Sequence, residues 1–238
     1  MDLTSFPRPN VAVDVALATI DNDALKVLMI ERETEPFKSK FVLPGGFVHE
    51  GESPEETARR VLLEKTGLSR LFVEQLRAFG EPGRDPRGWV VSVAHFALVP
   101  AARLAKALRD DRARLITVMP RGDRRSSHRG TGAGSCDLLL DGEAVSPGFD
   151  HGTIVTAAIE RLRADLDRSM IAFAMLPKSF TLLELQRVHE LVLGRSLNKP
   201  HFRKKMLGMV FANGSTLTAT GELDRSGSHR PAEKYRLS

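Results

Sequence analysis

Residues 46–68 read GFVHEGESPEETARRVLLEKTGL, and this stretch contains the first predicted helix and the loop before it. Ser53, with Pro54 next to it and Glu56 three positions on, predicts a helix that begins with a capping box. Gly67 is the residue type that most often follows a helix, so the helix is predicted to run to about Thr66.

One face of this helix carries charged side chains. At roughly 100° per residue, Arg60, Val61, Glu64 and Lys65 share a face, while Leu62 points toward the core. Arg60 and Glu64 lie one turn apart and can pair with each other.

The spacing of the stretch resembles the box of Nudix hydrolases: Gly, five residues, Glu, seven residues, then Arg-Glu-apolar-any-Glu-Glu-any-Gly-apolar. The matching positions are Gly46, Glu52, Arg60, Leu62, Glu64, Gly67 and Leu68. Active Nudix enzymes hold magnesium on the Glu side chains, and the metal clamps a pyrophosphate and activates water. Val61 and Lys65 stand where the box has Glu. The resemblance implies a pocket for a nucleoside diphosphate derivative, and the two replacements predict no catalytic residue, no metal and no cofactor. The alternative is an ordinary amphipathic helix after a chance Gly-Gly pair.

The bulk composition is that of a globular protein. The chain has 238 residues, 42% hydrophobic and 27% charged, which permits one large domain or two small ones. Cys136 is the single cysteine, so an internal disulfide is excluded and a reducing, cytoplasmic location is expected. No apolar run is long enough to cross a membrane, and the N-terminus does not resemble a signal peptide.

Positive charge is concentrated near the C-terminus. Residues 177–238 hold eleven Lys/Arg and five Asp/Glu, a net charge of +6, whereas residues 1–176 have a net charge of −1. This asymmetry indicates a polyanion partner for the C-terminal part, although a solvated surface would look the same.

Alternating and apolar runs predict a sheet in the first half. Strands are expected at residues 11–20, 25–30, 71–79, 89–99 and 115–119, together with a strand that runs into a Gly loop over 41–47, a helix at 101–108 and a hairpin at 138–145. Residues 121–135 are rich in Arg, Gly and Ser and predict a loop, for which a phosphate contact and simple solvation both remain open.

Three helices and a hairpin are predicted at the C-terminal end. Asp150 is expected to cap a helix over about 151–166, Thr181 and Glu184 form a second capping box, and Asn198 with Pro200 starts a third helix. Strand-forming residues follow at 210–211, 216–220 and 233–237. This is the layout of a winged helix-turn-helix, and a small helical protein-binding module is the alternative.

Both halves together resemble the Nudix-related transcriptional regulators of NAD metabolism, the NrtR family. The resemblance rests on residues 36–38, 43–48, the altered box, 83–93, 180–186, 202–207 and 230–232. It implies an α/β plus α+β chain: a Nudix-like α/β/α sandwich with a mixed sheet over residues 1–150, and a winged helix-turn-helix over 151–238. The family senses ADP-ribose or a related NAD derivative, and its homodimers bind palindromic DNA operators near NAD-synthesis genes.

The candidate ligand-binding residues combine small, cationic and hydrogen-bonding groups: Gly45, Gly46, Arg60, Glu64, Lys65, Arg84, Asp85 and Arg87. A Gly pair lets backbone N–H groups approach phosphate, Arg suits bidentate phosphate recognition, and Asp can accept from ribose hydroxyls. Arg60 is also suited to brace the loop against Glu52. Lys65 either contacts the diphosphate or is a solvated lysine.

Trp89 suits adenine stacking as well as a core or interface role. His49, His95 and His151 lack metal-ligand spacing.

The candidate DNA-binding residues lie on the third helix, the second cap and the wing: Thr181, Lys199, His201, Arg203, Lys204, Lys205, Arg230 and Lys234. In the third helix Phe202 and Met206 are expected to face inward, which turns His201 and Lys204 outward.

The leading hypothesis is a ligand-responsive DNA-binding repressor. An ADP-ribose pyrophosphatase with an accessory C-terminal domain is the alternative, and a protein-recruiting module is a third. The carboxylate count of the box favours the repressor over the enzyme, and the basic C-terminal part argues against protein recruitment.

Overall fold

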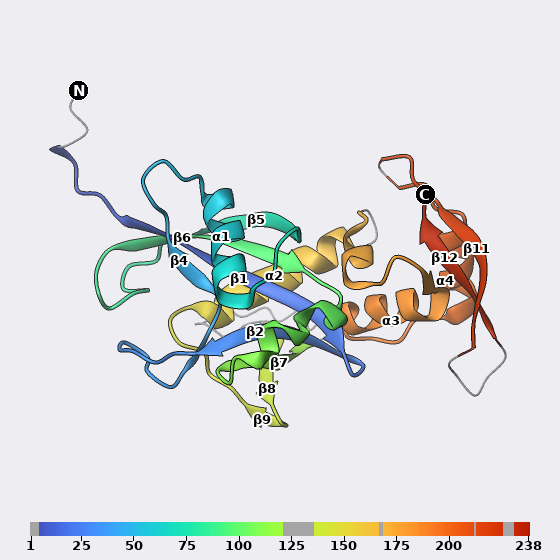
Figure 1. Cartoon of the computed structure of the whole chain (residues 1–238), viewed down its shortest axis with the longest axis horizontal. Helices are drawn as coiled ribbons and strands as arrows, with labels where there is room; N and C mark the ends of the chain where they lie inside the picture. Colours follow the sequence, from blue (N-terminus) through green and yellow to red (C-terminus); the bar gives the residue numbers. More distant parts are fainter. Residues whose placement is uncertain (1–4, 121–135, 167–168, 212, 226–230) are drawn as a thin grey trace, which may run out of the picture.

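The computed structural model describes residues 5–120, 136–166, 169–211, 213–225 and 231–238. A large sheet with helices on both faces forms the N-terminal part, and a smaller helical part with its own sheet lies at the other end, beside the C-terminus (Figure 1). Within these described ranges, every helix is too short or too polar to span a membrane.

The large sheet is mixed. Its strands run in the order β5 (Phe72–Phe79), β6 (Val90–Leu98), β1 (Asn10–Asp21), β2 (Ala24–Glu31), β7 (Ala113–Pro120), β8 (Cys136–Leu140) and β9 (Glu143–Ala144). Two short strands pair beside this path: β3 (Phe41–Val42) with β2, and β4 (Gly45–Phe47) with β1. The β1–β6 pair is parallel, and the other pairs of this sheet are antiparallel.

Helices α1 (Pro54–Thr66) and α2 (His151–Asp165) cover the sheet from opposite sides. The alternation of β1 directs its side chains: Val15 packs in the α1 cluster, and Ala16 packs in the α2 cluster. Three layers result, and the predicted α/β/α sandwich with a mixed sheet is confirmed.

The smaller part contains the predicted winged helix-turn-helix. It is built from η4 (Ile171–Met175), α3 (Leu182–Leu193), α4 (Lys199–Leu207) and a three-stranded sheet in the order β10 (Phe180–Thr181), β12 (Ala232–Leu237), β11 (Leu217–Asp224). The Thr181–Glu184 capping box and the Asn198 cap are both present, as predicted. Gly194 ends α3 in the left-handed conformation, which favours glycine.

Helix α2 packs in both parts of the molecule. Its Ile154 and Leu162 are fully buried in the same apolar cluster as Leu185 and Val192 of α3. At its C-terminal end Arg163 donates to the carbonyl of Val192. The predicted division between residues 150 and 151 therefore falls at the start of a shared element, and it remains a prediction.

Several local predictions were wrong. Gly45 and Gly46 lie in strand β4 rather than in a loop. Residues 101–108 are helical, as predicted, but they form two 3-10 segments, η2 (Ala101–Ala105) and η3 (Ala107–Arg109). Residues 210–211 are not in a strand. Asp150 is at the N-cap of α2, but its side chain makes no cap hydrogen bond because it pairs with Arg84. The predicted loop at 121–135 lies outside the described residues.

Candidate ligand pocket and DNA-binding surface

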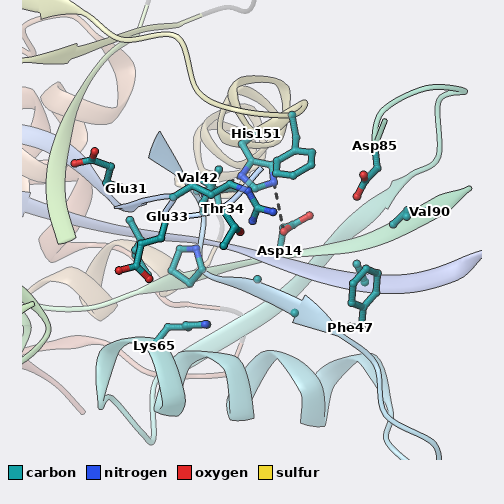
Figure 2. A pocket seen from close by; sticks show the side chains of 18 of the residues that line it. Asp14, Glu31, Glu33, Thr34, Val42, Phe47, Lys65, Asp85, Val90 and His151 are labelled. Carbon is teal, nitrogen blue, oxygen red and sulfur yellow. Dashed lines mark hydrogen bonds and ion pairs between the residues drawn. The ribbon is translucent and has the colours of Figure 1, made fainter. Parts of the chain in front are cut away.

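A cleft of about 360 Å³ opens beside the N-terminal half of β1. Strand β4, residues 31–34, 84–87 and 149–151, and the last turn of α1 form its walls (Figure 2). Six of the eight predicted ligand residues line it: Gly45, Gly46, Lys65, Arg84, Asp85 and Arg87. Arg60 and Glu64 are not among the lining residues. Small-molecule pockets usually begin at about 300 Å³, so the cleft is large enough for a ligand.

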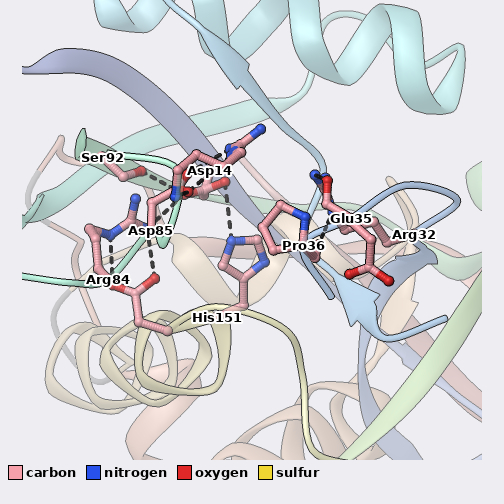
Figure 3. Close-up of polar contacts among 10 residues, drawn as sticks. Asp14, Arg32, Glu35, Pro36, Arg84, Asp85, Ser92 and His151 are labelled. Carbon is pink, nitrogen blue, oxygen red and sulfur yellow. Dashed lines mark hydrogen bonds and ion pairs between the residues drawn. The ribbon is translucent and has the colours of Figure 1, made fainter. Parts of the chain in front are cut away.

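A buried network of charges holds one side of the cleft together (Figure 3). Asp14, in the middle of β1, accepts from Ser92 of β6 at 2.7 Å and from Arg84 at 3.3 Å. Arg84 also donates to both carboxylate oxygens of Asp150, at 2.8 and 2.6 Å, and its side chain is only 5% exposed. The guanidinium of Arg84 is therefore already hydrogen-bonded within the protein.

His151 completes this network from the first turn of α2. Its Nδ1 accepts a hydrogen bond from the backbone N–H of Leu43 at 2.8 Å, which places the ring proton on Nε2, 3.4 Å from Asp14. Burial lowers the pKa of His151, so the neutral ring is favoured.

Strand β4 places the Gly pair at close range to Asp14. Pro44 and Val48 bond to β1 on either side of Gly46, so the N–H of Gly45 points away from β1 in the alternating antiparallel pattern. A Cβ on Gly45 would lie 2.3 Å from Oδ1 of Asp14. Glycine is required here by close packing, because the carboxylate is fixed from three sides.

Arg87 projects from the loop between β5 and β6 and is held by Asp85. Its Nε and a terminal nitrogen donate to the two oxygens of Asp85, at 2.9 and 2.6 Å. These hydrogen bonds lower the pKa of Asp85, which keeps the carboxylate ionised. The guanidinium carbon of Arg87 lies 5.6 Å from the ring centres of both Phe47 and Phe149. Asp85 thus orients Arg87.

The box helix is braced as the sequence predicted. Arg60 donates to both oxygens of Glu52, at 2.6 and 2.9 Å, and to the carbonyl of Phe47 at 3.0 Å. The hydrogen bonds from Arg60 and then from Thr57 lower the pKa of Glu52 to about 2. Arg60 also reaches Glu64 at 3.4 Å. These contacts confirm that Arg60 closes the loop before α1 onto the helix.

The box does not provide a magnesium site. Magnesium needs several oxygen ligands, but Val61 is 1% exposed and apolar, Lys65 lines the cleft, and the oxygens of Glu52 are bonded to Arg60 and Thr57. Among the residues that the structure describes, no group of three or more His, Cys, Asp or Glu is arranged to hold a metal ion. The donor set here therefore does not fit the metal that Nudix enzymes use.

Sequence reasoning missed Asp14, Phe149, Arg32 and Arg112 as lining residues, and it considered His151 only as a metal ligand. The sequence could have indicated Asp14, because it is the one acid inside the apolar run VAVDVALATI. An acid in a buried strand needs hydrogen-bonding or charged partners, which often belong to a functional site. Trp89 is 55% exposed and does not line the cleft.

Helix α4 presents a basic surface at the other end of the molecule. Phe202 and Met206 are buried and anchor the helix, which confirms the predicted inward face. The exposed candidates on it are Lys199, His201, Arg203 and Lys204, and Lys205 is half-buried. Arg203 also approaches the hydroxyl of Tyr235 in β12, at 3.4 Å, which connects α4 to the wing.

The other DNA-binding candidates are placed differently. Thr181 is 4% exposed, and its hydroxyl and N–H both bond to Glu184 in the capping box. It serves α3 as a cap in this structure. Lys234 lies half-buried on β12, paired in register with Thr181. Arg230 lies outside the described residues.

Comparisons with known proteins agree with this architecture. A profile of the NUDIX domain matches residues 9–118, and a profile of the NrtR DNA-binding winged helix domain matches residues 172–237. The chain thus joins a Nudix domain to a winged helix domain of the NrtR type.

Relatives that match nearly the whole chain identify its family. The ADPR responsive transcriptional repressor NtrR of Acinetobacter baylyi is 31% identical over 99% of this chain and 84% of its own length. The crystal structure of Shewanella oneidensis NrtR complexed with a 27mer DNA matches with a TM-score of 0.75 at 30% identity, covering 96% of this chain and 93% of that one. The chain belongs to the NrtR family.

A shorter match concerns the Nudix part alone. An ADP-ribose pyrophosphatase of Methanocaldococcus jannaschii is 46% identical over 88 residues, which are 37% of this chain and 50% of that protein. The chain spans half the length of this relative.

Replacing Gly45 with alanine should disrupt the cleft. The new Cβ would overlap Asp14, which is fixed by Ser92, Arg84 and His151, so we expect a loss of roughly 1–3 kcal/mol in the free energy of unfolding. Chemical denaturation would measure this loss. Gly152→Ala is the matched control, because its Cβ would meet nothing closer than 3.8 Å. Equal stability of the two variants would contradict the close packing described here.

Proposed function

We propose that this protein is a transcriptional repressor that binds operator DNA through its winged helix and responds to ADP-ribose bound in its Nudix domain. The observation that carries the proposal is the presence, in one chain similar along 99% of its length to an ADPR responsive repressor, of an open cleft and an exposed basic helix. A homodimer on a palindromic operator and a cytoplasmic location follow from the same proposal.

Helix α4 is the proposed recognition helix. Lys199, His201, Arg203 and Lys204 project from it, and its apolar side is buried against α3. A recognition helix needs this division, because one side must hold to the domain while the other meets base edges and phosphates. Lys205 and Lys234 are proposed phosphate contacts beside it, and Arg230 is proposed for the wing on its sequence alone.

The cleft is the proposed effector site. Gly45 and Gly46 offer a backbone without side chains, and Arg87 offers a guanidinium held in a fixed direction by Asp85. Phe47 and Phe149 add apolar ring faces, which suit a nucleoside base. These groups match the parts of a nucleoside diphosphate derivative.

Two contacts are the proposed route from effector to DNA. Helix α2 begins in the cleft with His151, and in its last turn Arg163 donates to the carbonyl of Val192 in α3. Arg187 of α3 also pairs with Asp23 in the β1–β2 turn at 2.9 Å. A ligand that shifts His151 or Arg84 would act on α3 through a helix that is packed along its length.

We further propose that the protein is not a hydrolase. Glu64 is the only one of the three clustered box carboxylates that remains, and its side chain is 52% exposed and paired with Arg60. The similarity to an ADP-ribose pyrophosphatase supports the ligand class, while Val61 and Lys65 argue against its chemistry.

Purified protein should therefore show negligible turnover of ADP-ribose with magnesium or manganese. Without the metal that polarises phosphate and activates water, the reaction lacks its main source of acceleration. Product release measured by chromatography, with an active Nudix pyrophosphatase assayed in parallel, would check this. Turnover of about one per second, at the low end of ordinary enzymes, would support the enzyme hypothesis instead.

ADP-ribose should change operator affinity, and the operator should change ADP-ribose affinity by the same factor. Coupled sites typically show about 5- to 150-fold effects, and the equality is required by linkage. Fluorescence anisotropy on DNA from NAD-synthesis promoters, with and without ADP-ribose, gives one side of the cycle, and calorimetry gives the other. Ligand affinity that is identical with and without saturating operator would reject the sensor proposal.

Lys204→Ala should weaken binding to all DNA sequences alike. Losing one phosphate contact should flatten the slope of log affinity against log salt by roughly 0.9. Lys178→Ala is the matched control, since Lys178 is also exposed in the C-terminal part but lies outside α4 and the wing. A salt series in which both variants match the unmodified protein would move the DNA site away from α4.

A further inference from the structure

Five basic side chains line the cleft, and four of them are already bonded within the protein. Arg84 pairs with Asp150 and Asp14, Arg87 with Asp85, and Arg112 with Asp110 and Glu33. The fourth donates to backbone carbonyls: Arg32 bonds to Pro36 and Glu35.

Lys65 is the exception. Within the described part of the chain it makes no hydrogen bond or ion pair, and it is exposed on the cleft wall. Figure 2 shows it extending from α1 on the side of the cleft opposite Asp14 and His151. Its ammonium group is therefore available to an anion that enters the cleft.

The position of Lys65 at the C-terminal end of α1 favours a positive charge there. It lies in the last turn, where the helix dipole places partial negative charge and repels a phosphate. One turn before it, Val61 is buried, and its Cγ2 would lie 3.0 Å from a Cβ on Gly46. Val61 thus fills the space beneath β4 with methyl groups and offers no oxygen to a metal ion.

We propose that the ammonium group of Lys65 takes the place of the divalent cation, so that a diphosphate ligand binds in this cleft without any metal. The inference rests on the proposed ADP-ribose function and specifies how that site recognises its ligand. Lys65 contacts the diphosphate, and Gly45 and Gly46 of β4 form the wall beside it.

The test is calorimetry of ADP-ribose with the full-length protein, in EDTA and in excess magnesium. The unmodified protein should bind equally well in both. Lys65→Met should bind roughly 10- to 100-fold more weakly in both conditions, because a hydrogen bond to a charged group is lost. Lys65→Glu should bind more weakly still in EDTA and recover part of its affinity in magnesium, since the ion can then be held between the new carboxylate and the diphosphate.

Two further variants separate a specific role from a change of net charge. Lys178→Glu makes the same charge change at an exposed lysine in the C-terminal part, outside the cleft, and should leave ADP-ribose binding unchanged. Lys65→Arg keeps a cation and should lose less affinity than Lys65→Met. Thermal unfolding of each variant checks that it is folded, and the comparison of EDTA with magnesium in the unmodified protein needs no variant.

The outcomes are distinct. Binding by the unmodified protein that requires magnesium, or equal affinity of Lys65→Met and the unmodified protein, would overturn this inference and leave the proposed function standing. An absence of ADP-ribose binding in both conditions would overturn the proposed effector, and the inference with it.

Discussion

The buried carboxylate of Asp14 is the interaction centre that holds one side of the cleft together. It lies in the buried part of β1, and it is bonded from β6 by Ser92, from the β5–β6 loop by Arg84 and from α2 by His151. A buried charge of this kind is costly unless every partner is present, and losing one partner typically costs about 3–5 kcal/mol. The network therefore fixes the relative positions of three regions that are distant in sequence, namely β1, the β5–β6 loop with β6, and the start of α2, and these regions form one side of the cleft.

This constraint also explains why α2 starts where it does. Asp150 would ordinarily cap the helix with its own carboxylate, but both of its oxygens bond to Arg84. Phe149, just before it, has a positive φ of 53°, an uncommon conformation for an aromatic residue. Its ring packs on Phe37 and on His151, and it lines the cleft. The N-terminus of α2 therefore lacks the usual side-chain cap, because the carboxylate of Asp150 bonds to Arg84 in the wall of the cleft. A ligand that moves Arg84 would act directly on the start of α2.

Local patterns were enough to predict the α-helices α1, α2, α3 and α4. The capping boxes at Ser53 and Thr181 and the glycines after α1 and α3 act within a few residues, and the structure contains all of them. The brace between Glu52 and Arg60 was also predictable, because its residues lie in one short motif. Asp14 and His151 were not recognised as cleft residues because their contacts span long stretches of chain. His151, for example, receives its hydrogen bond from a residue 108 positions away.

Several predicted site residues have a structural use that their residue type alone did not indicate. The Gly pair predicted a phosphate loop, and the structure places it in strand β4, where Gly45 passes against Asp14. Thr181 suggested a DNA contact, but its hydroxyl is used to start α3. Arg84 suggested a phosphate contact, and it is bonded to two carboxylates. In each case the structural contact comes from tertiary packing or from the helix cap, and an argument from residue type alone does not take such contacts into account.

The two departures from the box are best understood as a pair. Residues 61 and 65 lie one turn apart, and Glu followed four residues later by Lys is the favourable order for an ion pair on a helix. A Glu retained at position 61 would therefore draw the ammonium group of Lys65 along the helix and neutralise it. With Val61 packed beneath Gly46, that competitor is gone, and no other described carboxylate pairs with Lys65. The apolar replacement is thus the condition under which the basic replacement can serve a ligand, and neither change has the same consequence alone.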